Sequence, residues 1–220
     1  MRLCKLALVF GVVALVAGPA LAQPGRGGFR MGGAMLLRVE KVQKDLDLSK
    51  DQIKKADEAL TKSMEDNREN FQKLFDPNVS QEDKDAIRKK MTEANEKMVK
   101  DILEEKQQKR LKQIERQQQG IDMFQDAAVV KALKISDKQK DQIKEINEEM
   151  TKEVAELFKD GFSREKLAKV QTMRKEALEK TVKVLDDDQK KALKDLNGKP
   201  LELKPEDFPR PTKPAKPRDF

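Results

Sequence analysis

Acidic side chains that are adjacent in the sequence are the residues best suited to chemistry. Glu104 and Glu105 form one pair, and Asp186, Asp187 and Asp188 form a run of three. Paired carboxylates can act as general acid and base when their surroundings shift one pKa. Both groups stand where a helix is expected to begin, however, and acidic residues in a first turn stabilise a helix by opposing the positive end of its dipole. We therefore interpret them as helix starts and predict no catalytic residue.

Other reactive side chains are almost absent. The chain has no histidine, and its one cysteine is Cys4, close to the N-terminus. No imidazole base, thiol nucleophile or soft-ligand metal site is therefore available after this segment, and no glycine-rich phosphate loop follows a strand pattern. We predict a protein without enzymatic activity, cofactor or metal site.

Residues 1–22 have the pattern of a secretory signal peptide. Two basic residues precede an apolar run over residues 6–17, and the small residues Ala20 and Ala22 precede the expected cleavage before Gln23. The apolar run is shorter than the roughly 20 residues that a membrane-spanning helix needs. We predict an exported protein, periplasmic or otherwise secreted, with no stable membrane insertion after cleavage of the signal peptide.

Composition and charge favour an all-α protein built from thin, elongated helical layers. The chain has 47 Lys+Arg and 40 Asp+Glu, a net charge of +7, and loses two basic residues with the signal peptide. Basic and acidic residues are finely mixed, which is typical of solvated helix faces and not of a basic surface for nucleic acid. With 40% charged residues and no tryptophan or tyrosine, the chain cannot fill a thick core.

Four short motifs mark helix starts. In the segment 48–52, the Ser49 hydroxyl can accept a hydrogen bond from the backbone N–H of Gln52, while the Gln52 side chain reaches back to the N–H of Ser49. This capping box recurs at 135–139, and with an acidic residue in place of serine at 103–107 and 185–189. The motif residues are Leu48, Ser49, Gln52, Leu103, Gln107, Ile135, Ser136, Gln139, Leu185 and Gln189.

Apolar residues three and four positions apart predict two long helices after the first motif. The first should run from Ser49 to about Phe75, with the apolar stripe interrupted only at Asn67. The segment 76–78 contains a proline and should end this helix, and Ser80 should cap the second one. The two helices then form a hairpin.

The flanks of this hairpin are less clearly defined. A short helix is expected over residues 34–44. Residues 103–119 either continue the second long helix or begin a new one. Because glutamate is a weak N-cap, Glu104 leads us to favour continuation.

The same plan then repeats. A lead-in helix is expected over 123–133, an arm from Ser136, a return arm from Ser163 and a last short helix that ends at Gly198. Corresponding landmarks recur 82 to 87 residues apart, and the first arm is four residues longer in the first copy, about one helical turn. This regularity indicates an internal duplication.

These observations divide the chain into five segments. Proline-rich basic composition at the C-terminal end favours an extended tether. We predict a signal peptide (1–22), a flexible Gly/Arg-rich leader (23–33), helical hairpin unit 1 (34–120), helical hairpin unit 2 (121–198) and a disordered Pro/Lys-rich tail (199–220).

Methionine and phenylalanine lie on or beside the apolar stripes, and two interpretations of them stay open. They can form the core between the helices, as such stripes usually do. Alternatively, flexible methionines on a thin layer can form an adaptable surface for varied partners. The candidate client-binding residues are Met64, Phe71, Met91, Met98, Met150, Phe158 and Met173.

The repeated motif resembles that of the Spy/CpxP-like envelope proteins, which carry Leu-Thr-x-x-Gln twice. Leu48-Ser49-x-x-Gln52 and Ile135-Ser136-x-x-Gln139 match it with conservative changes, and the resemblance covers residues 40–198. It implies an ATP-independent periplasmic chaperone or stress regulator, in which two long-helix hairpins pair into a curved, positively charged cradle for partly unfolded clients. Some relatives bind metal through histidine, which this chain lacks.

The resemblance implies that a cationic, methionine-rich helical surface holds unfolded or partly folded proteins. The duplication implies an intramolecular pseudo-dimer, with a homodimer as the alternative. A second function class is a structural or stress-regulatory envelope protein that binds one fixed protein partner. A fixed partner predicts a single saturable complex, whereas a chaperone predicts salt-sensitive binding to many unfolded proteins. A membrane-surface role is disfavoured because acidic residues are mixed among the basic ones.

Overall fold

The computed structural model describes residues 33–208, and every regular element in this range is helical, which confirms the all-α prediction. The predicted signal peptide, the predicted leader up to residue 32 and residues 209–220 lie outside the described residues. Within 33–208, no helix combines the length and the apolar character that crossing a membrane requires.

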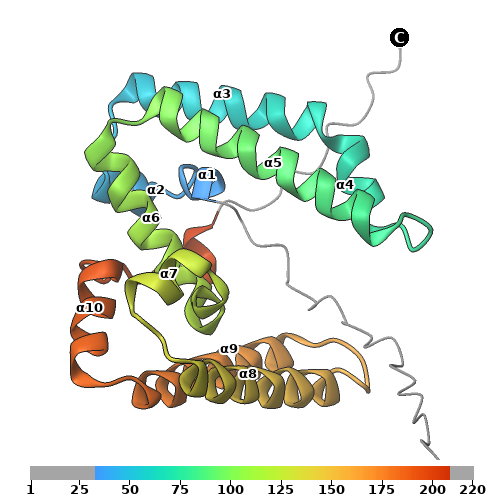
Figure 1. Ribbon diagram of the computed structural model, residues 1–220. Coiled ribbons are helices and arrows are strands. Elements are labelled where there is room, and N and C mark those ends of the chain that lie inside the picture. Colours follow the sequence, from blue (N-terminus) through green and yellow to red (C-terminus); the bar gives the residue numbers. More distant parts are fainter. Residues whose placement is uncertain (1–32, 209–220) are drawn as a thin grey trace, which may run out of the picture. The chain divides into compact units, whose positions relative to one another are not determined.

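Two successive groups of helices follow the same order (Figure 1). The first repeat, residues 33–119, contains α1 (Gly33–Leu36), α2 (Glu40–Asp45), α3 (Lys50–Asp66), α4 (Arg68–Phe75), α5 (Gln81–Ile102) and α6 (Glu105–Gln119). The second repeat, residues 120–197, contains the 3₁₀ helix η1 (Gly120–Gln125), α7 (Ala127–Ala132), α8 (Asp137–Leu157), α9 (Arg164–Val184) and α10 (Asp187–Asn197). A short 3₁₀ helix, η2 (Pro205–Asp207), follows.

The start of each repeat is built in the same way, with counterparts 87 residues apart. Asp47 and Lys134 both have φ +51°, in the left-handed region. After each of them the next N–H reaches back to close the preceding helix, from Leu48 to the carbonyl of Gln43 at 3.0 Å and from Ile135 to that of Val130 at 3.1 Å. This is the Schellman ending of a helix, and it turns the chain directly into the capping motif.

The long arms pair within each repeat. In Figure 1, α5 runs beside α3 and α4, and α9 runs beside α8. The first arm is not one continuous helix, because Asn67 has φ −100° and ψ +11° and its side-chain amide donates to the Ser63 carbonyl at 2.8 Å. The Ser63 carbonyl thus accepts both the backbone N–H of Asn67, at 3.1 Å, and its side-chain amide, and this local side-chain bond accompanies the bend between α3 and α4.

The predicted continuation of the second arm through Leu103 is wrong. Helix α5 ends at Ile102, Leu103 is extended with φ −102° and ψ +144°, and α6 begins at Glu105. The weak N-cap Glu104 is supported by Gln107, whose side-chain oxygen accepts the Glu104 N–H at 3.0 Å. The buried Leu103 side chain, 4% exposed, then holds the turn in the core.

Each repeat has its own hydrophobic cluster, and both clusters lie at the motif end of their hairpin. Helices α4 and α5 contain no fully buried residue. The first cluster contains Leu36, Leu37, Val39, Val42, Leu46, Ala56, Leu103, Leu111 and Ile114. The second contains Met123, Phe124, Val129, Leu133, Ile135, Ile143, Leu185 and Leu193.

The predicted disordered tail does not begin at Lys199. Residues 199–208, here called the C-terminal strap, pack on the first repeat, where Leu201, Leu203 and Phe208 contact its hydrophobic cluster. Burial of these three apolar side chains offsets the conformational entropy that the strap loses when it packs. Only residues 209–220 of the predicted tail lie outside the described residues.

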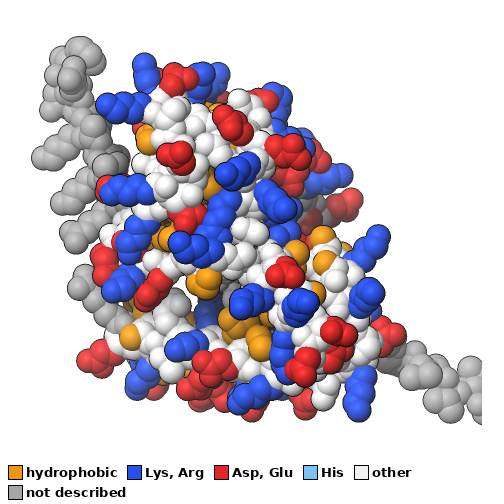
Figure 2. Space-filling view, turned by 90° about the vertical axis from the view of Figure 1, so that its left-hand side faces the viewer, with side chains coloured by type: hydrophobic (Ala, Val, Ile, Leu, Met, Phe, Trp, Pro, Cys, Tyr) orange, Lys and Arg blue, Asp and Glu red, His pale blue; other side chains and the backbone are white. Residues whose placement is uncertain are grey.

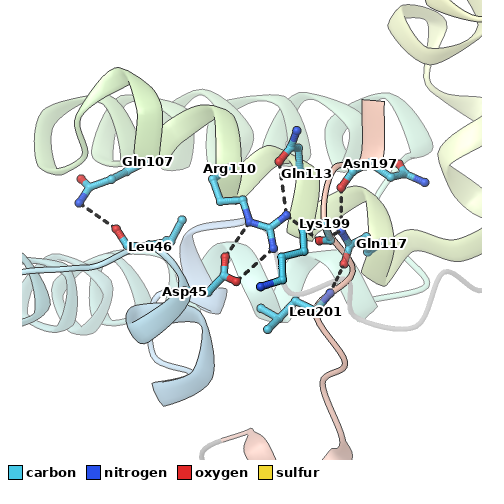
Figure 3. A network of polar contacts seen from close by, with 9 residues as sticks. All are labelled: Asp45, Leu46, Gln107, Arg110, Gln113, Gln117, Asn197, Lys199 and Leu201. Carbon is cyan, nitrogen blue, oxygen red and sulfur yellow. Dashed lines mark hydrogen bonds and ion pairs between the residues drawn. The ribbon is translucent and has the colours of Figure 1, made fainter. Parts of the chain in front are cut away.

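Polar contacts from α6 hold the strap in place (Figure 3). The Gln117 side chain donates to the carbonyls of Asn197 and Lys199 at 2.7 and 2.9 Å and accepts the N–H of Leu201 at 2.9 Å. Arg110 donates to the Lys199 carbonyl at 2.8 Å and forms a two-pronged ion pair with Asp45, at 2.6 and 3.1 Å. Helix α6 therefore connects α2, the end of α10 and the strap.

Candidate functional site

The two capping motifs of the first repeat meet in space although they are 55 residues apart. Gln52 Nε2 donates to Gln107 Oε1 at 2.7 Å, and Gln107 Nε2 returns a bond to Gln52 Oε1 at 3.3 Å. Each amide also donates to a backbone carbonyl next to the other motif, that of Ile102 at 3.0 Å and that of Leu46 at 3.1 Å. The glutamines thus cap their own helices and join the two helix starts.

The second repeat contains the same pair. Gln139 Nε2 donates to Gln189 Oε1 at 2.7 Å and to the Val184 carbonyl at 3.0 Å. Gln189 Nε2 donates back to Gln139 Oε1 at 3.0 Å and to the Lys134 carbonyl at 3.3 Å. Gln189 is only 8% exposed. The motif glutamines therefore hold the base of each hairpin together.

The remaining motif residues also stabilise the base of each hairpin. Ser49 and Ser136 accept hydrogen bonds from Gln52 N–H at 3.2 Å and Gln139 N–H at 3.3 Å, as the capping-box pattern predicts. Asp186 replaces the serine in the last motif and accepts the Gln189 N–H at 2.8 Å. The four apolar motif residues, Leu48, Leu103, Ile135 and Leu185, all pack in or against the hydrophobic clusters.

The candidate client-binding residues lie elsewhere, along the arms. None belongs to either hydrophobic cluster. Met64 is 46% exposed, and the other six are half-buried. Met150 and Met173 line the same shallow gap between α8 and α9. The structure brings these two methionines together. The candidate residues Met64, Phe71, Met91 and Met98 lie on the arms of the first repeat, and Met150, Phe158 and Met173 lie on the arms of the second.

Within residues 33–208, the most exposed large apolar side chains lie beside the apolar stripes but are not among the candidate client-binding residues predicted from the sequence. Phe75 is 76% exposed and Phe162 is 73% exposed, and each lies next to the turn at the far end of its hairpin. Phe162 stacks on Phe158, with ring centroids 5.6 Å apart. An apolar residue directly beside a turn signal, outside the stripe of its helix, was the pattern that could have identified them. We call Phe75, Phe158 and Phe162 the tip phenylalanines.

Among residues 33–208, the shifted ionisable groups are members of simple ion pairs and hydrogen-bonded pairs. Where a pKa departs from its usual value, a nearby partner of opposite charge accounts for the shift: Lys44 lowers the pKa of Glu40, and Lys140 lowers that of Asp137. Within residues 33–208, no three acidic, histidine or cysteine side chains gather as metal ligands. Basic and acidic side chains are mixed over the face drawn in Figure 2, with hydrophobic side chains between them.

The arrangement therefore offers hairpins closed at the base and apolar side chains exposed towards the tips. Comparison of the chain with protein-family models, with curated protein sequences and with solved structures gives no match.

Proposed function

We propose that this protein is an exported, non-catalytic client-binding protein of the cell envelope that holds partly unfolded polypeptides without ATP. The observation that carries the proposal is the exposure of Phe75 and Phe162 at the tips of both hairpins. Aromatic side chains are enriched where proteins contact partners, and Phe162 forms an apolar surface together with Phe158, on which it stacks.

The arms suit varied clients better than one rigid partner. Helices α4 and α5 contain no buried residue, so the apolar side chains of this hairpin keep part of their surface exposed. The α5 methionines, Met91 and Met98, can therefore adopt several rotamers. Flexible, methionine-rich surfaces are typical of proteins that bind many partners. The lysines and arginines along the arms favour fast encounter with acidic unfolded chains, and the apolar side chains then hold them.

The test is the aggregation of a chemically denatured model protein that is diluted with and without the purified chain lacking residues 1–22. Light scattering is recorded without nucleotide, at low and high salt. We expect suppression at near-stoichiometric amounts that weakens as salt rises. A variant with Phe75→Ser and Phe162→Ser should lose most of the suppression, because both side chains are exposed and their removal leaves the clusters intact.

The matched control carries Gln72→Ser and Asp160→Ser, which change exposed polar residues on the same tips. It should suppress aggregation as well as the unchanged chain. Equal activity of the phenylalanine variant and this control would contradict the role of the tips. Absence of suppression at either salt concentration, together with one saturable complex in a pull-down from envelope extract, would favour a fixed partner.

A further inference from the structure

The second repeat contains a pocket of about 230 Å³ between η1 and the first turns of α8. Its apolar wall consists of side chains that are at most 8% exposed, and two amines lie at its rim. The wall residues are Ile121, Phe124, Ile135 and Ile143, and the rim residues are Lys140 and Lys144.

In the first repeat, the region that corresponds to this pocket is closed. Each pocket residue of the second repeat has its counterpart 87 residues earlier in the chain. Leu60 stands at the position of Asn147 and is 2% exposed. Arg38, at the position of Gln125, forms an ion pair of 2.9 Å with Asp57, which stands at the position of Lys144.

The closing arginine is held firmly. Besides its ion pair, Arg38 donates to Thr61 Oγ1 at 2.7 Å and to the Asp57 carbonyl at 3.3 Å. Gln125 and Lys144 cannot form such a pair because both lack a negative charge. The substitutions between the repeats therefore remove the closure in the second repeat and leave an open pocket.

The second repeat also places an amide inside this pocket. Asn147 lines it, and its Oδ1 atom is buried without a hydrogen-bond partner among the described residues. A buried amide oxygen without a partner is unfavourable, because it has lost its hydrogen bonds to water. The same side chain carries an NH₂ group, which can donate hydrogen bonds, so Asn147 gives the pocket one polar group besides the rim amines.

The rim amines are available to such a ligand. Lys140 pairs with Asp137 at 2.7 Å and Lys144 with Glu148 at 3.9 Å, and all four side chains are at least half exposed. Exposed ion pairs within one helix contribute little to stability because water and salt screen them, so a ligand carboxylate can replace them at small cost.

We propose that this pocket binds a small amphiphilic carboxylate, with its alkyl or aryl body on the isoleucine wall and its carboxylate beside Lys140 and Lys144. A cavity of about 150 Å³ accommodates benzene, so a ligand of about ten non-hydrogen atoms fits the volume of the pocket. The site is separate from the tip phenylalanines and does not depend on client binding.

The test is a titration of the full chain, labelled at isoleucine methyl groups, with sodium octanoate. We expect saturable shifts of the Ile121, Ile135 and Ile143 methyl signals, which line the pocket. Octylamine and 1-octanol at the same concentrations are the matched probes, and both should bind at least several-fold more weakly. Absence of saturable shifts with octanoate, or equal affinity for all three probes, would overturn the proposal.

A closed variant provides the control within the chain. Gln125→Arg, Lys144→Asp and Asn147→Leu together copy the closure of the first repeat. This variant should unfold at a higher temperature and lose at least tenfold in octanoate affinity. A second variant, Lys144→Met, keeps the pocket open and should weaken octanoate binding several-fold while leaving octanol binding unchanged. Unchanged octanoate binding in the closed variant would place the ligand elsewhere and contradict the assignment.

Discussion

Gln139 and Gln189 donate hydrogen bonds to each other, with Gln139 Nε2 at 2.7 Å from Gln189 Oε1 and Gln189 Nε2 at 3.0 Å from Gln139 Oε1. The same oxygens accept the N–H groups of Ser136 and Asp186, each at 3.0 Å. Each glutamine amide therefore caps the start of its own helix and also joins that helix to another one, whose motif lies 50 residues away in the sequence. Hydrogen bonds that share their atoms in this way are lost together.

Substituting Gln189 by alanine should therefore destabilise the protein by about 2–3 kcal/mol, because it leaves buried partners without hydrogen bonds. Urea denaturation followed by circular dichroism measures the loss. Gln142→Ala is the control, since Gln142 is exposed on α8 and should change stability by less than about 0.5 kcal/mol. In a double-mutant cycle with Gln139→Ala, the two losses should not add. Simple additivity would show that the pair is not coupled.

Thr181 in α9 should tolerate an apolar replacement. Its side chain is fully buried, and its Oγ1 atom has no hydrogen-bond partner within residues 33–208. The first repeat has Val99 at the corresponding place, packed against its hydrophobic cluster. Thr181→Val should stabilise the protein by about 1 kcal/mol, because it removes a buried hydroxyl without changing the shape of the side chain.

The denaturation midpoint of this variant is compared with that of Thr172→Val. Thr172 lies on the same helix but is exposed, and its hydroxyl donates to the Ala168 carbonyl at 3.3 Å. This control should gain nothing. A loss of stability on Thr181→Val would indicate that the hydroxyl has a bound partner such as water.

Lys134 occupies the left-handed backbone region with φ +51°, which costs a residue other than glycine about 1 kcal/mol. Lys134→Gly should therefore stabilise the second repeat by about 0.5–1 kcal/mol in a urea titration. Lys131→Gly, inside α7, should have the opposite sign, because glycine is unfavourable within a helix. Equal effects at the two positions would contradict the strain argument.

The strap should loosen at low pH. Lys41 lies 2.8 Å from Asp207 and is the main cause of the lowered pKa of that carboxyl, with the Lys204 N–H as a second cause. Since the folded pKa lies below the usual value, the contribution of Asp207 is complete above about pH 4 and is lost as the pH falls through the folded pKa. The pKa of Lys41 is raised, so its contribution is lost only as the pH rises through that value.

Hydrogen exchange of the Leu201 N–H, which is bonded to Gln117 Oε1, reports on the strap. Its protection, corrected for the intrinsic rate, should fall below about pH 4. Asp207→Asn should lower the protection at neutral pH and remove most of this pH dependence. A pH profile that is the same in the variant would show that another group controls the strap.

Local structure could be predicted from the sequence, whereas contacts between distant segments could not. The capping boxes at Ser49 and Ser136 involve residues three positions apart, so the motif is sufficient to define them. The interruption at Asn67 was likewise visible as a break in the apolar stripe. The start of α6 was missed because Glu104 was judged as an isolated cap, although Gln107 completes that cap and itself contacts Gln52 across 55 residues.

The packing of the strap and the exposure of the tips could not be predicted for a related reason. Proline content dominated the interpretation of residues 199–208, although Leu201, Leu203 and Phe208 supply apolar contacts to a cluster far away in the sequence. Similarly, the spacing of apolar residues along an arm does not indicate how much of the apolar stripe is buried against other helices. The half-buried state of Met91 and Met98 follows from the single layer of helices around them, which only the three-dimensional arrangement shows.

The packing of the strap on the first repeat has a consequence for biosynthesis. The first repeat emerges from the ribosome before the second, yet part of its hydrophobic cluster is covered by residues 199–208, which are translated later. At roughly 5–20 residues per second, several seconds pass during which this cluster is incomplete. Among residues 33–208, the cluster of the second repeat includes no residue beyond Leu196, so within this range the hairpin that is translated last is the first that can complete its core.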